Sequence, residues 1–213
     1  MNNITLICFD IDDTLIRGNS WRDLHGALGM TPEENKRMYE AYQSGSMTYD
    51  EWLAQILVIY KKNGLASKSF IQSTLQQFEL VPGAQDIVTY LRDGGYTVAI
   101  ISGSFDILTS AVADALHVDV RKGNTSLIFD ADEMLQDLRS YGDETHAKLL
   151  HLQHFCDELR IPLTECACVG DGANDLEMFR ATGKGITFRT APAMVQHEAW
   201  KVIDAFSDLK SFL

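Results

Sequence analysis

Three short apolar segments of this chain each end in a polar residue, and they constrain the fold more than any other feature. They are residues 4–10 (ITLICFD), 96–102 (YTVAIIS) and 165–171 (ECACVGD). Apolar runs of this length, rich in β-branched residues, are typical of strands buried on both faces. Helical patterns precede the second and third runs, at residues 83–93 and 145–159. Strands that alternate with helices predict a parallel, Rossmann-like α/β sheet.

The segment between residues 17 and 80 interrupts this alternation, because it contains helix signatures and no convincing strand. TPEE at 31–34 and TYDE at 48–51 both have the spacing of a helix capping box, in which a threonine and a glutamate three residues later cap one another. We therefore expect a core domain formed by residues 1–16 and 81–213, with an α-helical cap domain inserted between them at residues 17–80.

The remainder of the chain predicts three further elements. Residues 120–133 contain Lys122, Gly123 and Asn124 between more apolar stretches, which indicates a short hairpin that turns at those three residues. Residues 183–188 and 201–206 have the composition of additional strands.

Composition and charge restrict the partners and the compartment. The formal net charge is −12 and no cluster of Lys and Arg stands out, which argues against nucleic acid or an anionic membrane as a partner. No apolar run reaches the roughly 18 residues that span a bilayer, and the first residues lack the basic start of a signal peptide. The four cysteines lie in apolar or helical stretches, as free thiols do in a reducing compartment. We expect a cytoplasmic monomer or homodimer.

Polar residues that close the predicted strands are expected to lie close together. They are Asp10 with Asp12, then Ser102, then Asp171. Parallel α/β sheets bind ligands at the carboxyl ends of their strands, so these side chains should share one crevice. Asp10 and Asp12 are two residues apart, which places both carboxylates on the same side of an extended chain. Taken alone, the pair also fits a turn or a helix N-cap.

Two further motifs suggest anion binding and a second acidic loop. Ser102 precedes a helical pattern at residues 106–116, which predicts an anion site at a helix N-terminus, although a plain N-cap serine fits as well. Lys148 lies in a helical run, where a solvated surface lysine is the ordinary interpretation. The segment 169–178 (VGDGANDLEM) closes a strand with an acid and places two more polar residues, Asn174 and Asp175, at the start of a helix.

Together, DIDDTL (10–15), SGS (102–104), Lys148 and GDGANDLEM (170–178) resemble the four motifs of the haloacid dehalogenase (HAD) superfamily. The likeness is strongest to its phosphoserine phosphatase-like branch, subfamily IB, which has a helical cap after the first strand, as residues 17–80 do here. The resemblance implies a Mg²⁺-dependent phosphatase that hydrolyses a small phosphorylated metabolite, a phosphomonoester, through an aspartyl-phosphate intermediate.

The resemblance also implies a role for each motif residue. Asp10 is the expected nucleophile, and Asp12 is the expected general acid and base. The expected Mg²⁺ ligands are Asp10, the backbone carbonyl of Asp12, and Asp171.

The phosphoryl oxygens are expected to be held by the other motifs. The residues implied are Ser102, the N–H of Gly103, and Lys148, which we also count as catalytic. Asp175 and Asn174 are expected to support the metal site. The HAD fold also includes dehalogenases that act on carbon–halogen bonds, but these lack Mg²⁺ and lack an acid two residues after the nucleophile. The acids of this chain therefore favour phosphoryl chemistry.

The substrate is less constrained than the reaction. Phosphoserine phosphatases bind the amino acid with a glutamate and an arginine of the cap, whose positions fall near Asn19 and Gln55 here, so we expect little activity on phosphoserine. Trp21, Tyr49 and Trp52 belong to the insert, and they fit either its core or its substrate side. The alternatives are a phosphotransferase that uses an alcohol as acceptor, or a non-catalytic regulator that binds a phosphorylated ligand.

Overall fold

A computed structural model describes residues 4–213. Within these residues, one sheet has seven strands in the order β4-β3-β2-β1-β5-β6-β7. Along the chain the strands are β1 (Leu6–Phe9), β2 (Thr97–Phe105), β3 (Val120–Phe129), β4 (Leu135–Ser140), β5 (Cys166–Val169), β6 (Gly185–Phe188) and β7 (Lys201–Ile203). All neighbours pair in parallel except β3 and β4, which are antiparallel. The predicted Rossmann-like α/β class is confirmed.

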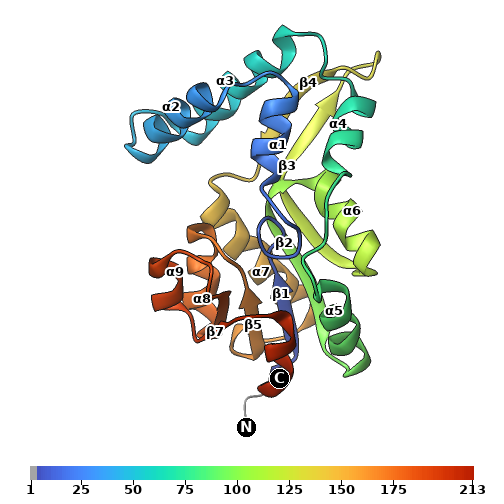
Figure 1. Ribbon diagram of the computed structural model, residues 1–213, viewed down its shortest axis with the longest axis vertical. Helices are drawn as coiled ribbons and strands as arrows, with labels where there is room; N and C mark the ends of the chain where they lie inside the picture. The colour runs from blue at the N-terminus through green and yellow to red at the C-terminus, as the bar shows by residue number, and fades with distance from the viewer. Residues whose placement is uncertain (1–3) are drawn as a thin grey trace.

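Helices cover both faces of the sheet (Figure 1). The helices of the first face are α5 (Ala84–Asp93) and α6 (Asp106–Leu116), and those of the second are α7 (Glu144–Leu159), α8 (Leu176–Thr182) and α9 (Ala193–Glu198). In β1, Ile7 and Phe9 pack toward the first face, whereas Leu6 and Cys8 pack toward the second. Both faces of β1 are therefore buried, which explains why its sequence is apolar at every position.

Three short 3₁₀ segments complete the core: η1 (Leu163–Glu165), η2 (Ala173–Asp175) and η3 (Phe206–Ser211). Strand β7 is shorter than the predicted strand at 201–206, because the chain leaves the sheet after Ile203 and η3 follows. Among the helices of residues 4–213, none combines the length and the apolar character needed to cross a membrane.

Residues 17–80 are helical, as their sequence predicted. Their four helices are α1 (Ser20–Ala27), α2 (Pro32–Gln43), α3 (Tyr49–Lys62) and α4 (Lys68–Leu75). Both predicted capping boxes form, since the side chains of Thr31 and Thr48 accept the N–H groups of Glu34 and Glu51. Figure 1 shows these helices beyond the end of β1, on the far side from the chain's C-terminus. The boundaries between a core and a cap domain stay a prediction.

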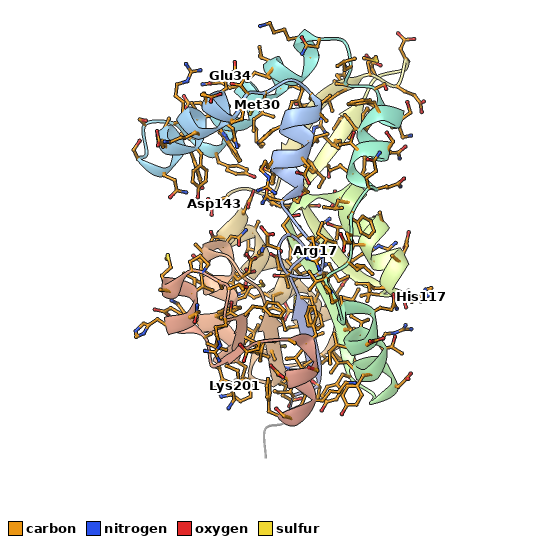
Figure 2. The ribbon with its side chains drawn as sticks, in the orientation of Figure 1. Arg17, Met30, Glu34, His117, Asp143 and Lys201 are labelled. Atoms are coloured by element: carbon orange, nitrogen blue, oxygen red, sulfur yellow. The ribbon has the colours of Figure 1, made fainter. Side chains whose placement is uncertain are left out.

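The two segments that join this insert to the core run side by side. Ile16 and Leu80 form an antiparallel bridge. Next to it, the N–H of Arg17 donates to the carbonyl of Glu79 at 2.8 Å, and the two side chains form an ion pair with a distance of 3.0 Å from Nε to Oε1. Arg17 lies at the level where the two halves of the molecule meet (Figure 2). The root of the insert is therefore a narrow two-stranded connection.

The hairpin predicted at residues 120–133 does not turn where we expected, because strand β3 occupies that position. The strand continues without a turn through residues 122–124, and the chain reverses only after β3 ends. Asp130 organises that turn, because its carboxylate accepts the N–H of Met134 at 2.9 Å. Gly123 has a packing role instead: a Cβ at this position would lie 2.8 Å from the backbone nitrogen of Asp106.

The hairpin of β3 and β4 reaches the insert at a second place. Ser67 and Met134 form an antiparallel bridge, and the N–H of Leu135 donates to the carbonyl of Ala66 at 2.8 Å. In Figure 1 the hairpin rises out of the core beside α1 and α4. The insert is thus held both at its root and at its far end.

Candidate active site

The order of the strands positions the site. The chain runs outward from β1 through β2 and β3 on one side, and through β5, β6 and β7 on the other. A ligand crevice forms at the carboxyl ends of the strands where the direction of winding reverses. Asp10 follows β1 directly, and Asp171 follows β5 after one glycine. Both acids therefore lie where the winding reverses, between the carboxyl ends of β1 and β5.

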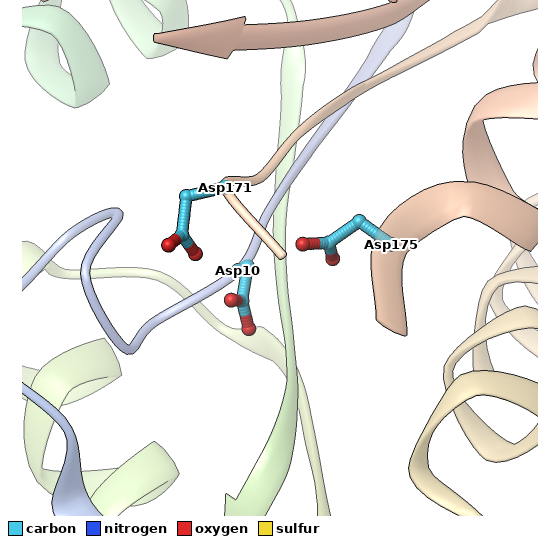
Figure 3. A group of neighbouring side chains, drawn as sticks. All are labelled: Asp10, Asp171 and Asp175. Atoms are coloured by element: carbon cyan, nitrogen blue, oxygen red, sulfur yellow. The ribbon is translucent and has the colours of Figure 1, made fainter. Parts of the chain in front are cut away.

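Asp10, Asp171 and Asp175 form one acidic cluster (Figure 3). Each offers a carboxylate oxygen, and these oxygens all lie within 4.8 Å of one another. Asp175 is held by the N–H of Gly172, which donates to its Oδ2 at 3.1 Å. Gly170 allows this approach, because a Cβ there would lie 2.3 Å from the Asp175 Cγ. The glycines of the second acidic loop thus bring its carboxylate against the first strand.

Lys148 is the buried cation of this cluster. Its Nζ lies 2.8 Å from an oxygen of Asp10 and 2.8 Å from an oxygen of Asp175, and its side chain is 0% exposed. The ordinary interpretation of a surface lysine is therefore wrong. Burial alone lowers the pKa of Lys148, but the two adjacent carboxylates outweigh this effect and raise the pKa above its usual value. The lysine stays protonated.

Asp171 lies at the more open side of the cluster. Its Oδ1 accepts the hydroxyl of Thr14 at 3.4 Å. Burial, together with the negative charge of Asp175, raises the pKa of Asp171 to about 7. The cluster contains one ammonium group, that of Lys148, and three carboxylates. Its net charge is therefore −2 when the three carboxylates are ionised. One divalent cation would balance them.

Asp12 is turned toward the start of helix α1. Its Oδ1 accepts the N–H of Ser20 at 3.0 Å, and its Oδ2 accepts the hydroxyl of Ser20 at 2.7 Å. The Ser20 hydroxyl also lies 2.5 Å from that of Ser104. Burial raises the pKa of Asp12 to about 6, and the bonds from Ser20 limit this rise. The side chain of Asp12 is thereby tied to the insert, a link that the sequence did not indicate.

Ser102 does not lie at a helix N-terminus, contrary to the prediction from its motif. Strand β2 continues through Phe105, and α6 begins only at Asp106, so Ser102 lies inside the strand and is buried. Its Oγ accepts the N–H of Ser104 at 3.0 Å. Gly103 and Ser104, rather than Ser102, line the cavity above the acidic cluster.

The cavity has a volume of about 420 Å³ and lies between the core and the insert. Its floor includes Asp10, Asp12, Asp171 and Asn174, all predicted site residues. Asp143, at the edge of the cavity, marks the level of this boundary in Figure 2.

Glu144 is a site residue that sequence reasoning missed. It is the first residue of α7, where an acid is ordinary because it complements the helix dipole, so nothing in the pattern distinguishes it. It lines the cavity, and its Oε2 accepts a hydrogen bond from the Nδ2 of Asn174, with a distance of 3.1 Å between the two atoms. It also lies against Gly103, where a Cβ would be 2.6 Å from that oxygen. Burial raises the pKa of Glu144 to about 7.

The insert contributes an aromatic wall to the cavity, formed by Trp21, Tyr42, Tyr49 and Trp52. Four ring pairs connect them. Trp52 pairs with Trp21, Tyr49 and Tyr42, with centroids 5.5, 5.4 and 5.8 Å apart, and Tyr42 pairs with Tyr49 at 5.8 Å. Trp21, Tyr49 and Trp52 are largely buried, so they serve the core of the insert and border the cavity at once.

Of the two positions matched to the cap charges of phosphoserine phosphatases, one borders the cavity. Asn19 lines it, whereas Gln55 is exposed elsewhere on α3. His25 also lines the cavity, but burial lowers its pKa to about 4, and its Nδ1 lies 2.7 Å from the Tyr60 hydroxyl. The imidazole is therefore neutral at neutral pH.

Comparison with known proteins agrees with this fold. A family model for haloacid dehalogenase-like hydrolases matches residues 4–183. A phosphoserine phosphatase of Methanocaldococcus jannaschii is 26% identical, over 89% of this chain and 87% of that protein. The phosphoserine phosphatase SerB2 of Mycobacterium tuberculosis is 30% identical over 89% of this chain, which spans only 45% of that protein. A solved substrate-bound phosphoserine phosphatase shares the fold, with a TM-score of 0.82, 23% identity and 100% coverage of both chains.

Proposed function

Because this chain belongs to the haloacid dehalogenase-like hydrolases, we propose that it is a Mg²⁺-dependent phosphatase acting on a small phosphomonoester, with Asp10 as covalent nucleophile. The observation that carries the proposal is the buried contact of Asp10 with Lys148, at 2.8 Å, within a cluster of three carboxylates below an open cavity. A buried ion pair at the floor of a pocket is typical of a catalytic site rather than of a surface turn.

The chemistry proceeds in two displacements. An oxygen of Asp10 attacks phosphorus, the ester P–O bond breaks, and Asp12 gives its proton to the departing alkoxide. In the second step Asp12 takes a proton from water, which attacks phosphorus and releases phosphate and the free Asp10 carboxylate. A pKa of about 6 suits Asp12 for both directions of proton transfer near neutral pH.

The donor set of the acidic cluster fits Mg²⁺. The carboxylates of Asp10 and Asp171, with the backbone carbonyl of Asp12, are hard oxygen ligands of the kind that Mg²⁺ prefers, and Asp175 and Asn174 would support them. When bound, the cation would offset the negative charge that nucleophile and phosphate bring together. Lys148 supplies a fixed positive charge beside Asp10, and we assign it to the phosphoryl oxygens as well.

The backbone around Gly103 is the proposed cradle for the remaining phosphoryl oxygens. Gly103 and Ser104 border the cavity, and we assign the N–H of Gly103 as the donor, because the N–H of Ser104 already donates to Ser102. Ser102, which is buried and does not border the cavity, positions this end of β2 by accepting a hydrogen bond from the Ser104 N–H. In that bond the Ser102 oxygen accepts, so its hydroxyl proton stays free to donate to a phosphoryl oxygen.

Phosphoserine is not the expected substrate. Neither Asn19 nor the exposed Gln55 carries the charge that would pair with the amino and carboxylate groups of serine. A polar substrate group that stays unpaired in a closed site costs several powers of ten in discrimination. We therefore expect kcat/KM for phosphoserine to fall well below that for the preferred ester.

The function is tested with a panel of phosphate esters, including p-nitrophenyl phosphate and phosphoserine. Release of phosphate is measured with Mg²⁺, with excess EDTA, and with Mg²⁺ restored. We expect turnover with Mg²⁺, its loss in EDTA and its recovery on addition of the cation. Turnover that persists in EDTA would contradict the metal assignment, and the absence of turnover on every ester would overturn the proposed function.

The affinity for Mg²⁺ is expected to decrease as the pH falls below about 7. The raised pKa of Asp171 means that its carboxyl binds a proton at pH 6, and a metal must displace that proton. Above pH 7 the carboxylate is already ionised and the affinity reaches a plateau. Titration calorimetry at pH 6 and pH 8 measures the difference, with proton release at pH 6 as its signature. Equal affinities without proton release would contradict this assignment.

A further inference from the structure

The wall of the cavity away from the acidic cluster has an unusual combination of aromatic rings and negative charge. Lys148 is buried and does not border the cavity, so Arg22 is the one cation at neutral pH among the described residues that do. Its Nε lies 3.8 Å from Asp23, and its side chain is 66% exposed. Water therefore screens this charge. A second anionic group on the substrate would find no buried partner in the insert.

The two indoles of the aromatic wall, those of Trp21 and Trp52, present carbon rather than polar atoms to the cavity. Within residues 4–213 the indole nitrogens of Trp21 and Trp52 are enclosed and have no hydrogen-bond partner. The parts of the two rings that border the cavity are therefore ring carbons. Such surfaces offer little to the hydroxyl groups of a polyol, but they attract a cation through the ring quadrupole.

Glu144 brings a carboxylate to the junction between this wall and the acidic cluster. It lies against Gly103 on the core side. Toward the insert, Glu144 lines the same cavity as Tyr49 of the aromatic wall, and burial, together with the negative charge of Glu144, raises the pKa of Tyr49. Its hydrogen bond from Asn174 is neutral, so its charge has no direct cationic partner among the described residues. A ligand that supplies a positive charge here would pair with the Glu144 carboxylate.

We propose that the alcohol part of the substrate carries an ammonium group, which lies between Glu144 and the aromatic wall while the phosphoryl group lies at Asp10. This assignment rests on the proposed function and specifies its substrate class. Two kinds of ammonium group fit this position. A primary ammonium would donate hydrogen bonds to Glu144, and a quaternary ammonium would contact the rings and Glu144 by charge alone.

Matched esters separate charge from shape. Phosphocholine is compared with 3,3-dimethylbutyl phosphate, in which carbon replaces the nitrogen, and phosphoethanolamine is compared with propyl phosphate. We expect each cationic ester to have a kcat/KM at least about tenfold above its neutral counterpart. The larger of the two ratios identifies the kind of ammonium. Equal kcat/KM within both pairs would overturn the inference, even if all four esters are hydrolysed.

Two variants test the residues. Glu144→Gln keeps the size and the ability to accept from Asn174 but removes the charge, and Trp52→Phe keeps an aromatic ring with a weaker quadrupole. Both are expected to lower the ratio of cationic to neutral kcat/KM several-fold, with a smaller effect on the neutral esters. Glu158→Gln is the control, because Glu158 lies on the same helix but is 61% exposed and pairs with His154. It should leave the ratio unchanged.

Binding provides a readout that does not require turnover. Trp21 and Trp52 border the cavity and Trp200 does not, so tryptophan fluorescence of the Asp10→Asn protein reports ligand binding. Phosphocholine or phosphoethanolamine should bind at least about tenfold tighter than its neutral analogue, and Glu144→Gln should remove most of this preference. A preference in binding without turnover by the wild-type chain would refute the phosphatase but support the ammonium site. Turnover without any preference would refute only the ammonium site.

Discussion

Replacement of Asp10 by asparagine is expected to lower kcat at least about a thousandfold, because an amide oxygen is a poor nucleophile toward phosphorus. The substitution keeps the size of the side chain, and Lys148 retains its second partner, Asp175, at 2.8 Å. The fold should therefore persist. Steady-state kinetics with the preferred ester measures the loss, and mass spectrometry of the wild-type chain trapped during turnover should detect phosphate on Asp10 but none in the variant.

The neighbouring acid provides the matched control. Asp13 lies in the same loop, is exposed, and has a φ of 50°, a conformation that asparagine tolerates. Its Oδ1 accepts the N–H of Gly18 at 3.1 Å, a bond that an asparagine oxygen can replace. Asp13→Asn should keep activity comparable to the wild-type chain. Full turnover by Asp10→Asn, or an equal loss in both variants, would reject Asp10 as the nucleophile.

Replacement of Lys148 by methionine is expected to lower the free energy of unfolding by about 3–5 kcal/mol at pH 8, because it leaves buried carboxylates without their cation. The methionine fills a similar volume, so a cavity contributes little to the loss. The side chains that lose their partner are those of Asp10 and Asp175, which are 5% and 0% exposed. Turnover should also be lost, since the positive charge beside the nucleophile is gone.

The pH dependence identifies the cause of this loss. Burial already raises the pKa of Asp10 in the folded chain, and Lys148 opposes this rise, so without Lys148 the pKa of Asp10 lies still further above its value in the unfolded chain. A raised pKa contributes stability that is present at low pH and is lost as the pH rises through the folded value. The deficit of Lys148→Met should therefore be smaller at pH 5 than at pH 8, as measured by denaturant unfolding without added metal.

Lys36→Met is the control for this substitution. The Lys36 side chain is 76% exposed and lies 3.8 Å from Glu40, an ion pair of the kind that contributes little to stability. Its unfolding free energy should change by no more than about 0.5 kcal/mol at either pH. A deficit of Lys148→Met that is equal at pH 5 and pH 8 would point to packing rather than charge.

The strands and the first acids could be predicted because they depend on local patterns. The apolar strand before Asp10 and the glycine-rich loop before Asp175 each determine where a carboxylate lies, and the order of the strands then brings the two together. The helices of the insert were predictable for the same reason, since a capping box such as that of Thr31 is a contact within four residues.

The features that sequence reasoning missed depend on contacts between distant segments. Ser102 was placed at a helix start because a helical pattern follows it, but pairing with β3 extends β2 to Phe105. Glu144 and Ser20 have the ordinary composition of helix N-termini, and only the tertiary fold brings them against Gly103 and Asp12. Long-range burial, which no short window of sequence contains, decided these positions.

The second attachment of the insert changes how a ligand can enter and leave. An insert attached only at its root, at Ile16 and Leu80, could rotate about that single connection. Here the bridge between Ser67 and Met134 joins the far end of the insert to the hairpin of β3 and β4. Any movement of the insert away from the core either breaks the Ser67–Met134 bridge or carries the hairpin of β3 and β4 with it, which bends the edge of the sheet. Such a movement therefore costs backbone hydrogen bonds at the sheet edge as well as contacts around the cavity.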